Sequence, residues 1–238
     1  YGNVAGTAGG ELSLLLDDAA PFERVTLDPQ RPAQTRLPMP QDRAWHRVTA
    51  ASDDGRFYAR SNPFGPSPVE GLQLYWGEIH SQSGLCDGTN SPAELYSYAR
   101  HAAGLDFASV SSHDFELTPD EWEEVKEATR DAHRPGEFVT FLGYEWSGPH
   151  ERGGDNNIYF LGDDGPLLYN GPWRGSAAWM DATEYIDRDR TLTDVCNELA
   201  GRDVMIIPHC GGRRCNFDFY DARLMPLFEI HSCHRTYE

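Results

Sequence analysis

The stretch that decides the fold is Leu72–Asp114, with the sequence LQLYWGEIHSQSGLCDGTNSPAELYSYARHAAGLDFASVSSHD. It predicts a strand ending at His80, a Gly-rich turn, a helix, and a second strand ending at His113 and Asp114. In parallel α/β folds, ligand-binding and catalytic side chains gather at the carboxyl ends of the strands. The two strands therefore place side chains of metal-ligand type one β-α unit apart.

The chain continues this alternation of strands and helices beyond Asp114. Ser91 and Glu94 form a predicted capping box at the start of the first helix. Later helices are expected over residues 119–133 and 193–200. Apolar runs predict three further strands, which end at Glu145, at His209, and among Glu229, His231, Cys233 and His234. The predicted fold class is α/β.

Residues 1–70 differ from the rest of the chain. They are rich in Pro and Gly and contain short alternating runs without helical periodicity. We expect a small β-rich N-terminal lead-in that packs on a main domain spanning residues 71–238. His46, beside Trp45, is interpreted as a structural histidine rather than a ligand.

The formal net charge of −18 argues against binding to a nucleic-acid backbone, which requires Lys and Arg to neutralise phosphates. A small phosphorylated substrate needs only a local positive site, so it is compatible with this charge. Lys126 is the only lysine. No apolar run has the length of a membrane span, so no membrane partner is expected. The sequence leaves the oligomeric state open.

The five cysteines are odd in number and form no Cys-x-x-Cys pair. This pattern argues against a disulfide scaffold and favours a reducing compartment. We therefore expect a cytoplasmic protein. The chain begins at Tyr1 without Met, and a processed start would leave periplasmic or secreted locations open.

Four potential metal ligands each end a short apolar run: His80, His113, Glu145 and His209. They are separated by 33, 32 and 64 residues, close to one, one and two β-α units of roughly 30 residues. Residues spaced in this way converge on one mouth of a barrel even though they are distant in sequence. Imidazole and carboxylate together suit zinc, manganese or iron, and sites with more than three or four such ligands suggest more than one ion.

The same segments resemble the motifs of the PHP family, named for polymerase and histidinol phosphatase. GEIHSQSGLCDGTNSPAEL is similar to its first motif and turn, and FASVSSHD to its second. FLGYEWS and MIIPHCGG resemble its metal-bridging Glu strand and its Pro-His strand. The resemblance covers roughly residues 72–234 and is closest to a branch whose first motif reads His-x-Gln.

The resemblance implies a distorted (βα)7 TIM-type barrel with two or three divalent ions (Zn, Mn or Fe). It also implies hydrolysis of phosphoesters by a metal-bound water. The matching positions give the expected metal ligands His80, Asp87, His113, Glu145, His209 and His234, with Gln82 and His231 as further possibilities.

This sequence departs from the family pattern in two places. Gln82 replaces the second histidine of His-x-His, and glutamine is a poor zinc ligand. The final Asp-x-His motif is missing, and only about five core strands are predicted. We therefore expect a barrel that is incomplete at its C-terminal end, with the chain being a fragment of a longer protein.

Two residues are candidates for catalysis. Arg214 could bind a phosphate or carboxylate, or could equally be a solvent-facing loop residue. Asp114 could orient a ligand histidine or assist proton transfer. The predicted function is a metal-dependent hydrolase acting on a small, phosphorylated substrate. Alternatives are an amidohydrolase-like enzyme for C–N or C–O bonds and a non-catalytic module that binds metal or phosphate.

Overall fold

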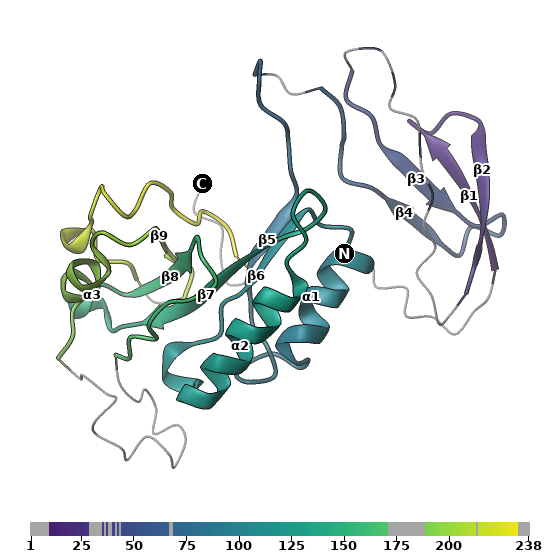
Figure 1. Ribbon diagram of the computed structural model, residues 1–238. Coiled ribbons are helices and arrows are strands. Elements are labelled where there is room, and N and C mark those ends of the chain that lie inside the picture. Colours follow the sequence, from purple (N-terminus) through teal and green to yellow (C-terminus); the bar gives the residue numbers. More distant parts are fainter. Residues whose placement is uncertain are drawn as a thin grey trace. The chain divides into compact units, whose positions relative to one another are not determined.

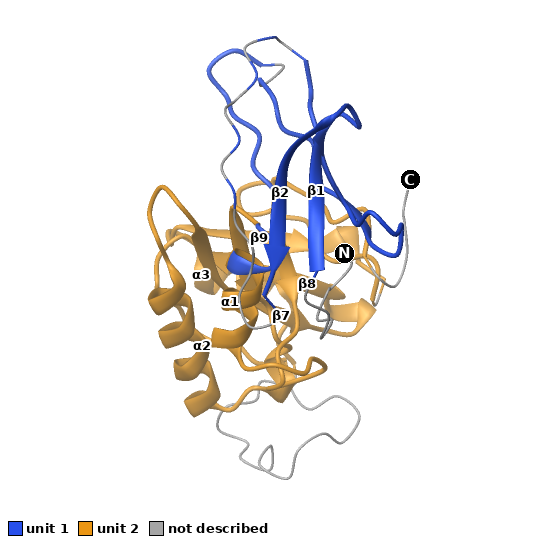
Figure 2. Ribbon diagram, turned by 90° about the vertical axis from the view of Figure 1, so that its right-hand side faces the viewer, with its two compact units in different colours: residues 1–76, 101–104 blue, residues 77–100, 105–238 orange. Residues whose placement is uncertain are grey.

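A computed structural model of the chain describes residues 10–28, 35, 37, 40, 42, 44–66, 69–170, 189–212 and 214–232. The chain forms two compact units, shown in separate colours in Figure 2. Unit 1 consists of residues 1–76 and 101–104, and unit 2 of residues 77–100 and 105–238. The division follows Trp76, whereas the predicted lead-in ends at residue 70.

Unit 1 contains a four-stranded antiparallel sheet with the order β2-β1-β3-β4 (Figure 1). Its strands are β1 (Gly10–Leu16), β2 (Pro21–Leu27), β3 (Val48–Ala51) and β4 (Tyr58–Arg60). Asp17 and Asp18 make the turn between β1 and β2 with φ angles of 51° and 59°. Asp tolerates this left-handed conformation, which tight hairpin turns require.

His46 is buried in unit 1 between two carboxylates. Its Nδ1 lies 2.7 Å from Oδ2 of Asp17, and its Nε2 lies 2.7 Å from Oδ1 of Asp42. These hydrogen bonds outweigh the effect of burial and raise the pKa of His46. The structure gives His46 a hydrogen-bonding role within the unit, in line with the structural interpretation.

Unit 2 is built on a five-stranded mixed sheet with the order β5-β6-β7-β8-β9 (Figure 1). Its strands are β5 (Gly77–Ser81), β6 (Phe107–Val110), β7 (Val139–Ser147), β8 (Asp155–Phe160) and β9 (Val204–Pro208). Strands β5, β6 and β7 are parallel, whereas β8 pairs antiparallel with both β7 and β9.

The helices of unit 2 are α1 (Pro92–His101), α2 (Pro119–Ala132) and α3 (Leu192–Leu199), with 3-10 turns η1 (Asp114–Glu116), η2 (His150–Arg152) and η4 (Phe217–Phe219). The capping box predicted at the start of α1 is confirmed, because Ser91 N donates to Glu94 at 2.9 Å and Glu94 N donates to Ser91 Oγ at 3.3 Å. No helix in the described ranges has the length and apolar character needed to cross a membrane.

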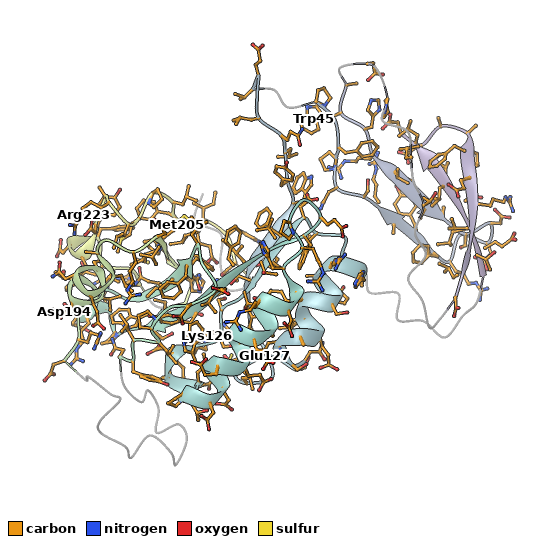
Figure 3. The ribbon with its side chains drawn as sticks, viewed as in Figure 1. Trp45, Lys126, Glu127, Asp194, Met205 and Arg223 are labelled. Carbon is orange, nitrogen blue, oxygen red and sulfur yellow. The ribbon has the colours of Figure 1, made fainter. Side chains whose placement is uncertain are left out.

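The core of unit 2 lies where α2 and α3 pack against the sheet. Trp122 and Val125 of α2 pack with Leu142 and Tyr144 of β7 in one buried cluster. Lys126, labelled on α2 in Figure 3, pairs at 2.8 Å with both Glu123 and Asp164. The single lysine thus ties the outer face of α2 to the loop after β8.

The mixed α/β character is confirmed, but the described sheets are open and do not form a closed barrel. The separation of 64 residues between Glu145 and His209 matches two lengths of a β-α unit, but the described part of this stretch contains the antiparallel strand β8 and helix α3. The connection from Ser147 to Asp155 is too short for a parallel crossover, which needs a dozen or more residues. Gly153 and Gly154, with φ of 131° and 80°, reverse the chain there.

We expect the His46 imidazole to titrate above the ordinary histidine pKa of about 6.5, because two carboxylates stabilise its charged form. Its contribution to stability is present below that pH and is lost as the pH rises through the folded-state pKa. Asp17 and Asp42 have lowered pKa values, so their contribution is lost as the pH falls through those values.

An NMR titration of the full chain, with His46→Gln for assignment, measures this value. A His46 midpoint at or below about 6.5 would contradict the two-carboxylate arrangement.

Candidate metal centre

The predicted ligands of unit 2 lie along one edge of its sheet. His80 lies in β5, Glu145 lies in β7, and His113 and His209 follow β6 and β9. His113 pairs in parallel with Glu145, and Glu145 pairs with Asn157 of β8. Because β8 is antiparallel, its first residues reach the edge at which the other strands end.

An irregularity in β5 positions His80. The register between β5 and β6 shifts between Glu78 and Ser81. The backbone N–H of His80 donates to Oε1 of Glu78 at 2.7 Å rather than to a neighbouring strand. Such bulges redirect a side chain at the end of a strand.

Glu145 is at the centre of the cluster, with its side chain 3% exposed. Its Oε2 lies 3.0 Å from His80 Nε2 and 3.3 Å from His113 Nδ1. The amide of Gln82 also donates to this oxygen at 3.0 Å. A buried carboxylate is costly unless it is compensated, and three nitrogens compensate this one.

A second carboxylate, Glu229, completes the other side of the cluster. Its Oε2 lies 2.7 Å from His80 Nδ1, and its Oε1 lies 3.1 Å from His209 Nδ1. Asn157 donates to Glu229 Oε2 at 3.2 Å. The rings of His80 and His209 meet edge to face with centroids 4.5 Å apart.

These contacts shift the charge states of the cluster strongly. Burial disfavours the charged form of His80, but the hydrogen bonds to Glu145 and Glu229 outweigh burial and raise its pKa to about 10. Burial opposes ionisation of Glu229, yet His209 and His80 lower its pKa to about 2. Burial likewise opposes ionisation of Glu145, and the neighbouring histidines lower its pKa. The cluster therefore holds two carboxylates in their charged form.

The turn after β5 brings Gln82 and Cys86 to the cluster. The Cys86 thiol donates to Oε1 of Gln82 at 2.6 Å, which leaves the amide nitrogen facing Glu145. A Cβ at Gly88 would lie 2.0 Å from the Gln82 carbonyl oxygen, so this close approach requires glycine. In this geometry Gln82 acts as a hydrogen-bond donor to a metal-ligand candidate.

His113 links Glu145 to the turn. Its Nδ1 lies 2.9 Å from the Ser147 hydroxyl, and its Nε2 lies 3.6 Å from Oδ2 of Asp87. The Asp87 side chain is 72% exposed, whereas that of His113 is 15% exposed. Asp87 thus lies at the solvent side of the cluster, as a ligand from the turn would.

Asp114 is fully buried beside this cluster, and backbone groups occupy both of its oxygens. Ser147 N donates to Oδ1 and Asn170 N donates to Oδ2, each at 2.8 Å. The carboxylate therefore connects the end of β7 to the segment before residue 171. These bonds give Asp114 a structural task, and its catalytic role stays a prediction.

The remaining predicted site residues are Arg214, His231 and His234. Arg214 is exposed, and its backbone carbonyl lies 3.1 Å from Nδ1 of His150. His231 is exposed two residues after Glu229. His234 lies outside the described residues. Their roles stay predictions.

Glu229 and Asn157 were missed as site residues by the sequence analysis. Glu229 stands between apolar Phe228 and Ile230, the same pattern that identifies Glu145 between Tyr144 and Trp146. The sequence shows this pattern, but the nearby histidines His231 and His234 were predicted as the metal ligands instead. Asn157 lies in a strand whose antiparallel direction the sequence does not reveal.

The donor set fits a divalent cation. One ligand atom each of His80, His209 and Glu229 lies within 4.8 Å of the others. Two imidazoles and a carboxylate are the donors that zinc, manganese and iron accept. The buried side-chain oxygen of Asn157 has no hydrogen-bond partner within the described ranges. Two ionised carboxylates and an unsatisfied oxygen are both compatible with a bound cation.

Comparison with protein families identifies the chain. The family described as "Protein of unknown function (DUF3604)" matches residues 88–213, more than half of the sequence. The chain belongs to the DUF3604 family. This match covers Glu145 and His209 but ends before Glu229. A search of curated proteins finds no match to this DUF3604 chain.

Two solved structures are similar to part of this chain. One is a two-domain protein from Bacteroides vulgatus ATCC 8482 that contains a predicted PHP-like metal-dependent phosphoesterase, with 17% identity and a TM-score of 0.41. The match covers 65% of this chain and 40% of that protein, so this chain spans less than half of its length.

The other is a candidate metal-dependent phosphoesterase from Bifidobacterium adolescentis ATCC 15703, with 17% identity and a TM-score of 0.42. That match covers 65% of this chain and 77% of the other.

We expect Asp114→Ala to lower the free energy of unfolding by on the order of 3 kcal/mol, because two buried backbone N–H groups lose their acceptor. Denaturant unfolding measures the loss. Asp114→Asn is the matched variant and should lose less, because it retains one acceptor oxygen. A variant with wild-type stability that lost only activity would show instead that Asp114 is catalytic.

Proposed function

We propose that this chain carries a metal-dependent hydrolase site that acts on phosphoesters. The observation that supports it most directly is the convergence of His80, His209 and Glu229 to within 4.8 Å, with Glu145 on the other nitrogen of His80. The ordered resemblance of the same segments to PHP motifs supplies the substrate class.

His80, His209 and Glu229 would hold a cation, and Glu145 with His113 and Asp87 would hold a second. When bound, divalent ions lower the pKa of a coordinated water and polarise a phosphoryl oxygen. Zinc, manganese and iron are the metals that this donor set suits.

The chain's own residues prepare the site. His80 gives up the proton that it holds between Glu145 and Glu229 when it becomes a ligand, so loading is favoured as the pH rises. Gln82 fixes one oxygen of Glu145 by donating to it, and Ser147 fixes the ring of His113. Such supporting hydrogen bonds orient metal ligands.

The substrate needs local positive charge in a chain of net charge −18. Arg214 lies in the segment that follows β9 and His209, and we propose that its guanidinium binds the substrate phosphate. A small substrate is expected, because a polyanionic backbone would be repelled by the acidic surface.

We expect the wild-type chain, purified without chelator, to retain at least one equivalent of transition metal by elemental analysis. Glu229→Gln and Glu145→Gln should lose most of it, because each removes a buried charge that the cation balances. Glu127→Gln is the matched control, since Glu127 lies exposed on α2 (Figure 3). If all four proteins retained the same amount of metal, the metal would be bound outside this cluster.

The reaction itself is tested with an aryl phosphate and a matched aryl acetate, each with Mn²⁺ and with EDTA. Metal-dependent release from the phosphate, lost in Glu145→Gln, supports the phosphoesterase. Release from the acetate alone would favour the carbonyl-hydrolase alternative. Metal retention without turnover of either substrate, or of a phosphodiester, would favour a binding module.

A further inference from the structure

Asn157 lies inside the cluster, yet the proposed mechanism uses it for no step. It belongs to β8 and is fully buried. Its Nδ2 lies 3.2 Å from Oε2 of Glu229 and 3.1 Å from Nδ1 of His80. These are two of the three residues that bring donor atoms within 4.8 Å of one another. The amide of Asn157 therefore borders the place where a cation would be held.

The sheet holds Asn157 at this place from both sides. Its backbone pairs with Glu145 of β7 and with Ile207 of β9. The preceding residue, Asn156, uses its amide elsewhere and donates to the Gly154 carbonyl at 3.0 Å. Successive residues of a strand face opposite sides of the sheet, so only the second asparagine faces the cluster. Asn157 can change the atom that it presents to the cluster, but its backbone cannot move away.

The two ends of this amide have different surroundings. Nδ2 faces Glu229, whereas Oδ1 is buried and has no hydrogen-bond partner among the residues that the structure describes. A half-turn about the bond that carries the amide exchanges its oxygen and its nitrogen. Oδ1 would then lie close to Glu229 and His80. Because Oδ1 gives up no hydrogen bond, the exchange costs only the contacts of Nδ2 with these two residues.

A bound cation would remove the reason for the observed orientation. Without a cation, the Glu229 carboxylate attracts the N–H groups of the amide. With a cation on Glu229 and His80, those N–H groups would face a positive charge, whereas the carbonyl oxygen would be attracted to it. Three protein ligands and a water complete a tetrahedral zinc site, but manganese takes more ligands and accepts carbonyl oxygen. An added amide oxygen therefore favours manganese.

We propose that Asn157 is a further metal ligand of this site. When a cation binds to His80, His209 and Glu229, the amide turns over and its Oδ1 coordinates that cation. The added oxygen shifts the preference of the site from zinc toward manganese. The presence of the cation rests on the proposed function, and Asn157 adds an oxygen donor to the ligands named there.

A purely supporting role for Asn157 makes a different prediction. If Asn157 only oriented Glu229 by donating to it, its loss would weaken the binding of every cation that Glu229 holds by a similar factor. Loss of an oxygen ligand would instead weaken the binding of manganese more than that of zinc. The ratio of the two affinities therefore separates a ligand from a residue that only orients one.

The first test measures the binding of Mn²⁺ and of Zn²⁺ to the full chain after a chelator has removed bound metal. In Asn157→Ser, we expect the Mn²⁺ affinity to fall by about tenfold and the Zn²⁺ affinity to fall clearly less. Asn197→Ser is the matched control, because Asn197 lies exposed on α3, and it should bind both ions as the wild type does. Equal losses of both affinities in Asn157→Ser would overturn the ligand role.

The second test uses the wild-type chain and so does not depend on whether Asn157→Ser folds. Asparagine is labelled with ¹³C at the side-chain carbonyl, and infrared spectra are compared with and without Mn²⁺. Coordination of Oδ1 should move a labelled band to lower frequency, because the cation draws electron density from the carbonyl bond. Asn157→Asp, which keeps the size of the side chain, should lack this change. A band that does not move in the wild type on Mn²⁺ binding would overturn the proposal.

The outcomes separate this inference from the proposed function. A shifted band in a chain that hydrolyses neither the aryl phosphate nor the aryl acetate would support Asn157 as a ligand and count against the hydrolase. Mn²⁺-dependent hydrolysis with an unmoved band would support the hydrolase and overturn the role of Asn157. A wild-type chain that binds neither ion would overturn both.

Discussion

The charge of the Glu145 carboxylate is the constraint on which the site of unit 2 depends. Its side chain is almost fully buried, and its compensation comes from three separate segments: His80 of β5, His113 after β6, and Gln82 in the turn after β5. A buried carboxylate without these partners would carry a penalty of several kcal/mol. The β5-β6-β7 order therefore packs the sheet and also keeps Glu145 ionised, because it brings these partners to its side chain.

Strand β8 gives the site its second half. By entering the sheet antiparallel, it places Asn157 beside Glu145 and moves β9 one position further out. The carbonyl of Asp155 holds the backbone of His209, and Asn157 donates to Glu229. Strand β8 thus separates β7 from β9 in the sheet and contributes Asn157 to the site.

Sequence patterns were sufficient to predict the position of residues of metal-ligand type that end an apolar run. His80, His113, Glu145 and His209 each end an apolar run, and the structure places all four on one edge of the sheet. The capping box of α1 was also predictable, because it joins two residues that are only three positions apart. The direction of β8 was not predictable in this way, because an apolar run reads the same in both directions. Glu229 joins the cluster through a single parallel bridge to His209. Hydrophobic periodicity does not predict such a pairing between separate segments.

The cluster can be followed as an alternating series of imidazoles and carboxylates, from His113 to Glu145, His80, Glu229 and His209. His80 is the only member that contacts both carboxylates, which explains why its pKa is raised so far. The proton that His80 holds between the two carboxylates offsets part of their charge. A cation that replaced this proton would balance the same charge with the same side chains as ligands. Binding would then need little reorganisation of the cluster.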